Sequence, residues 1–302
     1  MTIYKDEQTA ASIKLLALDM DGTTYYKMGT MIPQNVKPLQ AAMAEGVEIV
    51  FITGRPVLAR ANGLEGHGLV NSETIIAGYN GACIYALADH KPLKISPLKS
   101  TDAQAVFEYA NQPENAGTVI FGYVDDFQTV ITNASNPTSP NDKSIPYRAE
   151  MEFFDGQYLE YKNVEKNFNY NFFKLIAFGS PHHFCQSVVQ KFGLTVSTSN
   201  NQDGEITAPG IDKAFALEWI AKTKKIHRDE IMAIGDGAND LPMIEYAGYG
   251  VSLSNSIPIV KEKAQIQVPL SNVEGGVAYA IDKYVLKDKP SSSSTWLREE
   301  NK

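Results

Sequence analysis

Short apolar runs that end abruptly in a polar turn recur along this chain and leave few folds open to it. Residues 14–19 read KLLALD, and residues 47–54 repeat the design in VEIVFITG. Continuous apolar runs of this length are typical of parallel strands buried on both faces. Between them, residues 33–46 have apolar side chains at helical spacing and end at a glycine, which predicts a helix. Strand, helix and strand in this order predict a βαβ unit.

The same pattern returns near the other end of the chain. Residues 230–236 read EIMAIGD, and two further strand-like runs follow at 249–253 and 266–270. Helix-like stretches separate these runs, at 240–247 and 256–264. Strands that alternate with helices predict an α/β fold with a doubly wound parallel sheet.

The middle of the chain differs from both ends. Residues 117–133 contain two β-rich runs around a pair of aspartates, which predicts a hairpin, and more strands around another helix follow. Because 302 residues exceed the usual size of one core, we expect two domains, with this α+β part inserted into the other. Residues 134–150 are rich in Asn, Pro and Ser and predict a long loop. The predicted division is a core of residues 1–83 and 209–289, an insertion of residues 84–208 and a flexible tail of residues 290–302.

Composition and charge exclude several classes of protein. Hydrophobic residues make up 43% and charged residues 21%, as in ordinary globular proteins. A net charge of −8 argues against a nucleic-acid partner, because phosphate backbones are held largely by Lys and Arg. No apolar run approaches the roughly 20 residues that span a bilayer, and the start is polar, so we expect no membrane partner and a cytoplasmic location. Cys83 and Cys185 lack metal-type spacing and are expected to be buried thiols.

Acidic turns follow two of the predicted strands, where parallel sheets place ligands. Asp19 and Asp21, one residue apart on a strand end, project to the same side and could share a divalent cation. The turn GDGANDLPMI contains Asp236, Asn239 and Asp240. Asp236 could complete an oxygen-rich site for magnesium, which prefers near-octahedral oxygen ligands. A solvated acidic turn is the alternative for Asp19 and Asp21, and Asp240 could serve to support the turn.

Two further segments carry groups that bind phosphate. Thr53 and Gly54 end the second strand just before a predicted helix start, whose backbone N–H groups can bind phosphate oxygens. An ordinary strand-to-helix turn with a Thr cap is the alternative. Lys213 opens the helix-like segment DKAFALEWIAK, at the point where the chain re-enters the predicted core. It is either a surface lysine or a point charge for a transferring phosphoryl group and for Asp19.

Taken in order, DMDGTT, ITGRP, IDKAFAL and GDGANDLPMI resemble the four signature motifs of haloacid dehalogenase superfamily phosphatases. The resemblance covers essentially the whole chain, and four ordered motifs are more specific than any one of them. The inserted α+β part, together with YGVSLSN and EGGVAYAI, resembles the Cof-type branch with a type IIB cap. The resemblance implies a Rossmann-like core and a cap domain over its site.

The resemblance also implies a mechanism and a cofactor, Mg²⁺. Asp19 attacks phosphorus and forms an aspartyl phosphate, while Asp21 protonates the leaving oxygen and then deprotonates the hydrolytic water. Magnesium is held by the Asp19 carboxylate, the Asp21 backbone carbonyl and Asp236. The implied phosphate neighbours and the supporting acid are Thr53, Gly54, Lys213, Asn239 and Asp240.

This chain departs from the family pattern at two places. Ala214 stands where the family often has Gly, and Tyr25 and Tyr26 replace the commoner apolar pair, in the segment that would flex as the cap opens. Neither departure touches the catalytic set. A phosphomutase, which would return the phosphoryl group to a second hydroxyl, stays an alternative. A phospho-ligand sensor that has lost turnover is a third interpretation, because fold does not guarantee function.

The expected partner is a small phosphorylated metabolite, because a cap over the site excludes macromolecules and water. Sugar phosphates are favoured over nucleotide or cofactor phosphates. Candidate residues for selecting the substrate are Arg148, Lys162, Lys174 and the aromatics of residues 153–173. The sequence does not predict the oligomeric state.

Overall fold

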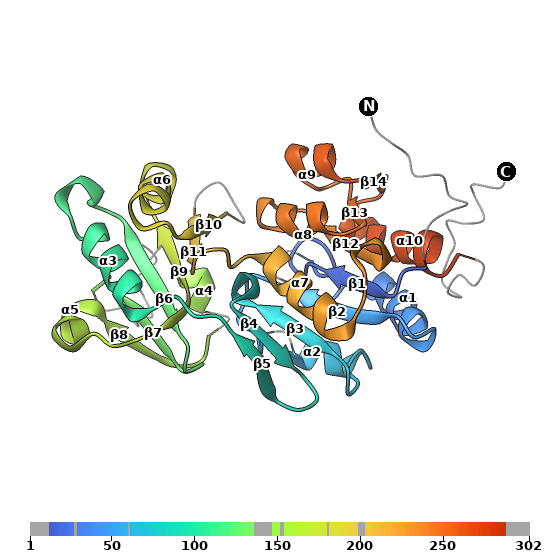
Figure 1. Ribbon diagram of the computed structural model, residues 1–302, viewed down its shortest axis with the longest axis horizontal. Coiled ribbons are helices and arrows are strands. Elements are labelled where there is room, and N and C mark those ends of the chain that lie inside the picture. The colour runs from blue at the N-terminus through green and yellow to red at the C-terminus, as the bar shows by residue number, and fades with distance from the viewer. Residues whose placement is uncertain are drawn as a thin grey trace.

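The computed structural model describes residues 12–26, 29–59, 61–135, 147–151, 154–179, 181–198 and 203–287. Two sheets, each covered by helices, make up these residues (Figure 1). The predicted tail of residues 290–302 and most of the predicted loop, residues 136–146, lie outside the described residues. Among the helices that the structure describes, none has the length and apolar character needed to cross a membrane.

The larger sheet has eight strands in the order β14-β13-β12-β1-β2-β3-β4-β5. It is parallel from β14 to β3, and β4 and β5 extend it in antiparallel fashion. The predicted α/β core with a parallel sheet is therefore confirmed. Its strands are β1 (Leu15–Leu18), β2 (Glu48–Ile52), β3 (Ile75–Gly78), β4 (Cys83–Ala86), β5 (Lys91–Ile95), β12 (Ile231–Gly235), β13 (Tyr249–Ser252) and β14 (Ile266–Gln267).

Helices cover both faces of this sheet because successive side chains of a buried strand point to opposite sides. Leu16 and Leu18 of β1 pack in one apolar cluster with α1 (Pro33–Ala44) and α10 (Gly276–Ala280). Leu15 and Ala17 pack in a second cluster on the other face. The helices of that second cluster are α7 (Lys213–Lys224), α8 (Leu241–Tyr246) and α9 (Pro258–Lys263), and the short α2 (Ala61–Gly66) follows β2.

The smaller sheet has six strands in the order β10-β11-β9-β6-β7-β8. The hairpin predicted within residues 117–133 is confirmed as β6 and β7, which pair in antiparallel fashion. Helices α3 (Ser100–Ala110) and α6 (Pro181–Phe192) pack on one face of this sheet. Its strands and other helices are β6 (Val119–Val124), β7 (Thr129–Thr132), β8 (Gln157–Glu160), β9 (Phe172–Phe178), β10 (Thr195–Ser197), β11 (Asp203–Thr207), α4 (Arg148–Met151) and α5 (Tyr161–Val164).

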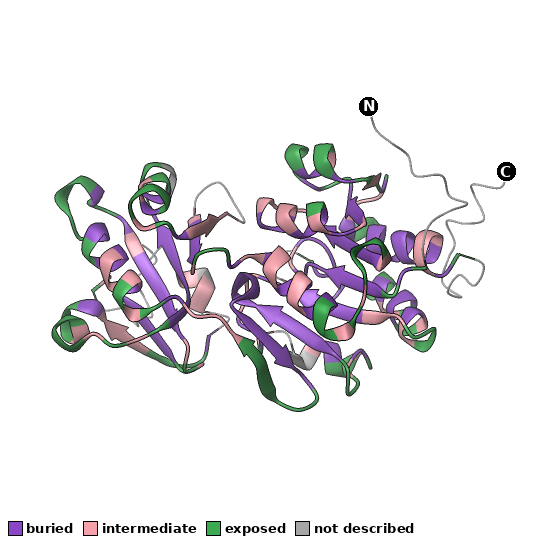
Figure 2. Cartoon of the chain, viewed as in Figure 1, coloured by how far each residue is buried: buried purple, intermediate pink, exposed green. Residues whose placement is uncertain are grey.

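The strands β4 and β5 bear on where the inserted part begins. Both belong to the larger sheet, so the predicted boundary at residue 84 falls inside β4. The outer strand β5 is exposed over most of its length, as its green colour in Figure 2 shows. Buried and exposed residues do not alternate along its sequence KPLKI. The division into domains stays a prediction, and we propose that the inserted cap domain begins after Ile95.

Aromatic side chains join the two sheets. Tyr79, in the short 3₁₀ turn Tyr79–Gly81 that follows β3, stacks on Phe173 of β9 with ring centroids 4.4 Å apart. The same ring meets Tyr123 of β6 edge to face at 5.4 Å. Aromatic pairs of this geometry add about 0.5–1.5 kcal/mol beyond the burial of their area. The contact fixes one end of the smaller sheet against the larger one.

Candidate active site

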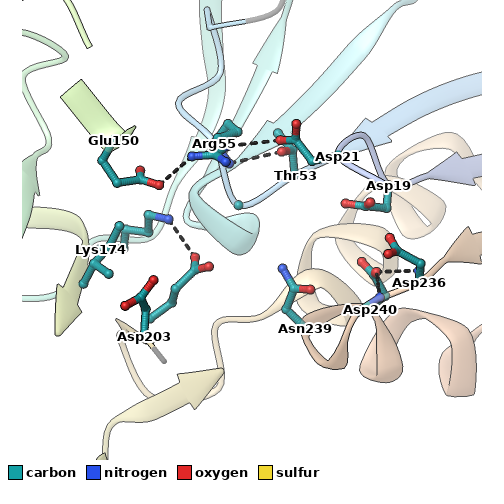
Figure 3. Close-up of a pocket in the computed structure, with 14 residues that line it drawn as sticks. Asp19, Asp21, Thr53, Arg55, Glu150, Lys174, Asp203, Asp236, Asn239 and Asp240 are labelled. Carbon is teal, nitrogen blue, oxygen red and sulfur yellow. Dashed lines mark hydrogen bonds and ion pairs between the residues drawn. The ribbon is translucent and has the colours of Figure 1, made fainter. Parts of the chain in front are cut away.

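Three neighbouring strands of the larger sheet deliver polar residues to one edge. β12, β1 and β2 are adjacent and parallel, so their carboxyl ends lie together. Asp19, Thr53 and Asp236 directly follow these strands. They line a cavity of ≈ 160 Å³ that residues of the smaller sheet also border (Figure 3). The other lining residues are Asp21, Gly54, Arg55, Glu150, Lys174, Ile176, Asp203, Glu205, Gly237, Asn239 and Asp240.

Lys213 is fully buried beside this cavity. Its Nζ donates to Asp19 Oδ1 at 2.6 Å and to Asp240 Oδ1 at 2.5 Å. The position of Lys213 is fixed by the helix start, because the Asp212 side chain caps α7 by accepting from the Phe215 N–H at 2.8 Å. Burial alone lowers the pKa of Lys213, but Asp19 and Asp240 outweigh it and raise that pKa. Lys213 is therefore a charged member of the site and not a surface lysine.

Asp19 has only 6% of its surface exposed. Burial, followed by the charge of Asp240, raises its pKa well above the ordinary value, although Lys213 acts in the opposite direction. A carboxylate in this position is a stronger base than one in water. A further positive charge nearby would favour its ionised form.

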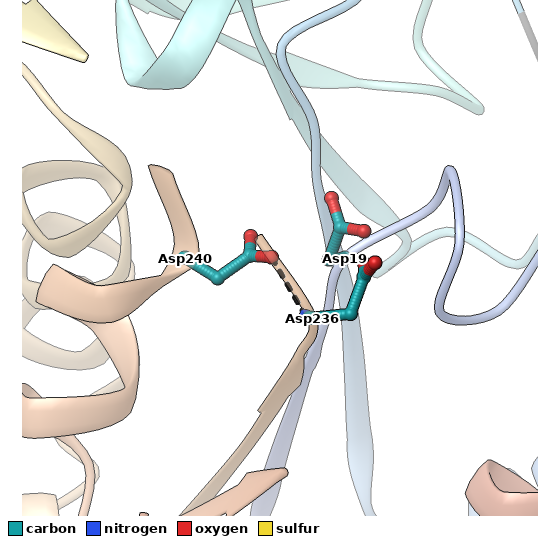
Figure 4. Close-up of side chains that lie close together, drawn as sticks. All are labelled: Asp19, Asp236 and Asp240. Carbon is teal, nitrogen blue, oxygen red and sulfur yellow. Dashed lines mark hydrogen bonds between the residues drawn. The ribbon is translucent and has the colours of Figure 1, made fainter. Parts of the chain in front are cut away.

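The acidic group around Asp19 fits a hard divalent cation. Ligand oxygens of Asp19, Asp236 and Asp240 all lie within 4.8 Å of one another (Figure 4). Asp240 Oδ2 accepts the backbone N–H groups of Asp236 and Gly237 at 2.9 and 2.8 Å, and its Oδ1 holds Lys213. Asp240 is thus engaged in supporting the turn, whereas oxygen ligands from Asp19 and Asp236 suit magnesium.

Gly22 lets the two acidic turns approach each other. Its φ is +89°, a left-handed conformation that glycine adopts without strain. A Cβ at this position would lie 2.7 Å from Asp236 Oδ2. The Thr23 hydroxyl, one residue further, donates to Asp236 Oδ1 at 2.9 Å. The sequence Asp-Gly-Thr after β1 therefore orients the acid that follows β12.

Of the predicted phosphate-binding residues, Thr53, Gly54 and Asn239 line the same cavity, whereas Lys213 lies behind Asp19. Thr53 Oγ1 accepts the backbone N–H of Arg55 at 3.1 Å, which holds the strand-to-helix turn at Gly54. Asn239 Nδ2 donates to Asn80 Oδ1 at 3.3 Å. Asn80 itself has a left-handed backbone, with φ +55°. The structure thus brings Thr53, Gly54 and Asn239 around the space beside Asp19.

Several lining residues were not predicted from the sequence. Arg55 donates from Nε to Asp21 Oδ2 at 3.0 Å and from Nη1 to Glu150 Oε1 at 2.5 Å. Glu205 Oε2 accepts from Lys174 Nζ and from Asn80 Nδ2, both at 2.7 Å. Arg55 follows directly on the predicted Thr53-Gly54 turn, so its position in ITGRP was an available signal. That Glu150 and Glu205 line the cavity is visible only in the tertiary structure.

The cap residues predicted to select the substrate differ in whether they line the cavity. Lys174 is buried and lines the cavity. Lys162 is exposed and pairs with Glu160 at 2.5 Å, away from the cavity lining. Arg148 is also absent from the lining residues in the described part of the chain. Cys83 and Cys185 are buried free thiols, as predicted.

Known proteins resemble this one over nearly the whole chain. The sequence model of a family described as haloacid dehalogenase-like hydrolase matches residues 16–281. Two Bacillus subtilis (strain 168) proteins are similar. One is 5-amino-6-(5-phospho-D-ribitylamino)uracil phosphatase YcsE, 26% identical over 95% of this chain and 100% of that protein. The other is phosphatase YwpJ, 25% identical over 88% of this chain and 98% of that protein. The solved subclass IIB sugar phosphatase BT4131 superposes with a TM-score of 0.73 and 20% identity, covering 90% of this chain and 98% of that one, a likeness of fold.

Proposed function

The chain belongs to the haloacid dehalogenase-like hydrolase family and is a hydrolase of phosphate monoesters, and we propose that it is a magnesium-dependent phosphatase with Asp19 as nucleophile. The observation that carries this proposal is the buried Asp19–Lys213–Asp240 group at the end of β1, open to a cavity on its other side. A carboxylate buried against a lysine is held in one orientation. It can therefore present one oxygen to phosphorus in a fixed direction.

The proposed reaction has two steps. In the first, Asp19 Oδ attacks phosphorus, the bond from phosphorus to the ester oxygen breaks, and Asp21 gives its proton to that oxygen. In the second, Asp21 takes a proton from water, which attacks the aspartyl phosphate and releases inorganic phosphate and Asp19. Thr53, Gly54 and Asn239 are proposed to bind the phosphoryl oxygens, with Lys213 adding charge through Asp19.

Magnesium is proposed to be held by the Asp19 carboxylate, the backbone carbonyl of Asp21 and Asp236. A bound Mg²⁺ supplies positive charge that keeps Asp19 ionised and neutralises phosphoryl oxygens. The mutual proximity of Asp19 and Asp236 and the raised pKa of Asp19, due first to burial, support a cation at this place. Asp240 supports the turn through its two backbone hydrogen bonds.

We infer that the substrate is a small phosphorylated metabolite, with a sugar phosphate favoured. Residues from the smaller sheet close the cavity opposite Asp19, so the space suits a compact leaving group. Asp203 and Glu205 of the cap border this side, and carboxylates accept hydrogen bonds from hydroxyl groups. The names of YcsE and BT4131 as phosphatases of small molecules are consistent with this class.

The test is phosphate release from a panel of sugar phosphates, nucleotides and cofactor phosphates, with Mg²⁺ or with EDTA. We expect release that requires Mg²⁺ and that disappears in Asp19→Asn, which removes the nucleophile's charge and keeps its shape. Turnover by Asp19→Asn close to the wild-type rate would refute the mechanism. Phosphoryl transfer between hydroxyls without free phosphate would instead assign a phosphomutase.

A further inference from the structure

A chain of polar contacts leads from Asp21 into the cap. Arg55 lies between Asp21 and Glu150, with its Nε at 3.0 Å from Asp21 Oδ2 and its Nη1 at 2.5 Å from Glu150 Oε1 (Figure 3). The hydroxyl of Tyr123 then donates to Glu150 Oε2 at 2.9 Å. Asp21 and Arg55 belong to the larger sheet's loops, whereas Glu150 is on α4 and Tyr123 on β6.

From this chain of contacts we propose that Glu150 and Tyr123 are positioning residues that act through Arg55 to orient the carboxylate of Asp21. The inference rests on the proposed role of Asp21 as general acid and goes beyond it. No substrate contact is assigned to either residue. Their effect is on which way the acid faces when the leaving oxygen needs a proton.

Arg55 is suited to transmit an orientation. Its guanidinium is planar and presents donors in a fixed fork, so a partner at each edge defines the plane of the group. Only 15% of its side chain is exposed, and the Asp21 and Glu150 side chains are similarly sheltered, at 18% and 17%. Ion pairs that are this sheltered from solvent are screened less by salt than ion pairs on the surface. Fixing Arg55 therefore restricts the rotation of the Asp21 carboxylate.

Tyr123 anchors the far end of the chain. It is fully buried, and its ring packs against Phe121 at 5.1 Å and Phe154 at 5.5 Å between centroids. Burial, and then the charge of Glu150, raise the pKa of Tyr123 well above its ordinary value. Its hydroxyl thus stays protonated and can donate to Glu150 at any working pH. With both carboxylate oxygens bound, Glu150 is held in one rotamer.

The chemical consequence is confined to the step in which the ester bond breaks. The electron pair of the phosphorus–oxygen bond goes to the leaving oxygen, and a poor leaving group needs the proton of Asp21 as that happens. A nitrophenolate spreads the charge into its ring and leaves without a proton. Misorienting Asp21 must therefore slow phenyl phosphate more than p-nitrophenyl phosphate, although the two esters have nearly the same shape apart from the nitro group.

The experiment compares kcat/KM for phenyl phosphate and p-nitrophenyl phosphate, with Mg²⁺ present throughout. This parameter reports the steps up to aspartyl-phosphate formation and is independent of the later hydrolysis. For Glu150→Gln we expect a loss of about 10-fold on phenyl phosphate, a fraction of the 10²–10⁴-fold effect of a general acid, and less than about 2-fold on p-nitrophenyl phosphate. Tyr123→Phe should show the same selectivity with a smaller loss.

A matched control is Tyr158→Phe. Tyr158 is another tyrosine of the smaller sheet, but its hydroxyl donates to the backbone oxygen of Phe154 at 3.1 Å. It should leave the ratio of the two kcat/KM values unchanged. Equal losses on both esters in Glu150→Gln, or no loss on either, would overturn the positioning role.

The assignment of Asp21 is tested separately. Asp21→Asn should show the same preference for p-nitrophenyl phosphate, and adding Glu150→Gln to it should change nothing further. If Asp21→Asn loses activity equally on both esters, the acid assignment fails. If Asp21→Asn is selective and Glu150→Gln is not, the acid assignment stands and the positioning role fails.

Discussion

Replacing Lys174 by Met should destabilise the protein strongly, although the new side chain is apolar and of similar length. Lys174 is 2% exposed and Glu205 is 5% exposed, and Nζ and Oε2 are 2.7 Å apart. The variant keeps Glu205 buried with a hydrogen bond from Asn80 but without its ion pair to Lys174. Breaking a buried ion pair from one side costs about 3–5 kcal/mol, because a charge is left uncompensated.

The double variant distinguishes this cause from simple loss of packing. In Lys174→Met with Glu205→Gln, the uncompensated charge is absent, and the Gln amide can still accept from Asn80. The double variant should therefore be more stable than Lys174→Met alone. If the two substitutions acted additively, it would be less stable than either single variant.

Urea unfolding followed by far-UV circular dichroism at 25 °C measures these free energies. Lys162→Met is the matched control, because Lys162 lies in the same cap and is itself 64% exposed, although the Glu160 side chain it pairs with is 16% exposed. It should change the unfolding free energy by less than about 0.5 kcal/mol. A Lys174→Met variant as stable as Lys162→Met would refute the reasoning. So would a double variant whose loss of unfolding free energy equals the sum of the losses in Lys174→Met and Glu205→Gln.

Three further results are expected. Mg²⁺ that binds the folded wild type at 100 times its Kd should add about 2.7 kcal/mol to the unfolding free energy and so raise the thermal midpoint, and Asp236→Asn should lose most of this increase at equal ionic strength. Lys213→Met should abolish phosphate release, whereas Lys222→Met, 73% exposed on the same helix, should keep it. Burial raises the pKa of Cys83 from 9.0 to about 12 and of Cys185 to about 11, so iodoacetamide at pH 8 should label both only after unfolding. Because folding raises these pKa values, the stability they contribute is complete below pH 9 and is lost as the pH rises towards about 11 for Cys185 and about 12 for Cys83. Prompt labelling of the native protein would contradict the burial.

The catalytic edge was predictable because it depends on local sequence. An apolar run followed by Asp or Thr-Gly marks a strand end, and parallel strand ends share one edge, so Asp19, Thr53 and Asp236 could be grouped without a structure. Lys213 followed from its place at a helix start. The cytoplasmic location, the phosphomutase alternative and the oligomeric state are untested by the fold.

The cap side of the cavity was not predictable, for a physical reason. Arg55 and Glu150 are 95 residues apart, and Asn80 and Glu205 are 125 residues apart. Contacts over such separations depend on how two sheets meet, which no local pattern encodes. The strand β5 was missed because an exposed edge strand has a polar sequence. Lys174 could be named as a candidate, but its partner could not.

The two sides of the cavity also differ in what holds them. Lys213 is enclosed within the core between Asp19 and Asp240, and separating it from these carboxylates would leave buried charges without their ion pairs. The contacts across the cap boundary include Arg55–Glu150, Asn80–Glu205 and the packing of Tyr79 on Phe173 and Tyr123. Water can replace the polar ones, so each contributes only about 0.5–3 kcal/mol, and the stack adds about 0.5–1.5 kcal/mol. Opening the cap would break contacts of this kind between the two sheets, whereas Asp19 and Lys213 both belong to the core and would keep each other as partners. We infer that the arrangement suits an enzyme whose cap must open for each substrate without disturbing Asp19.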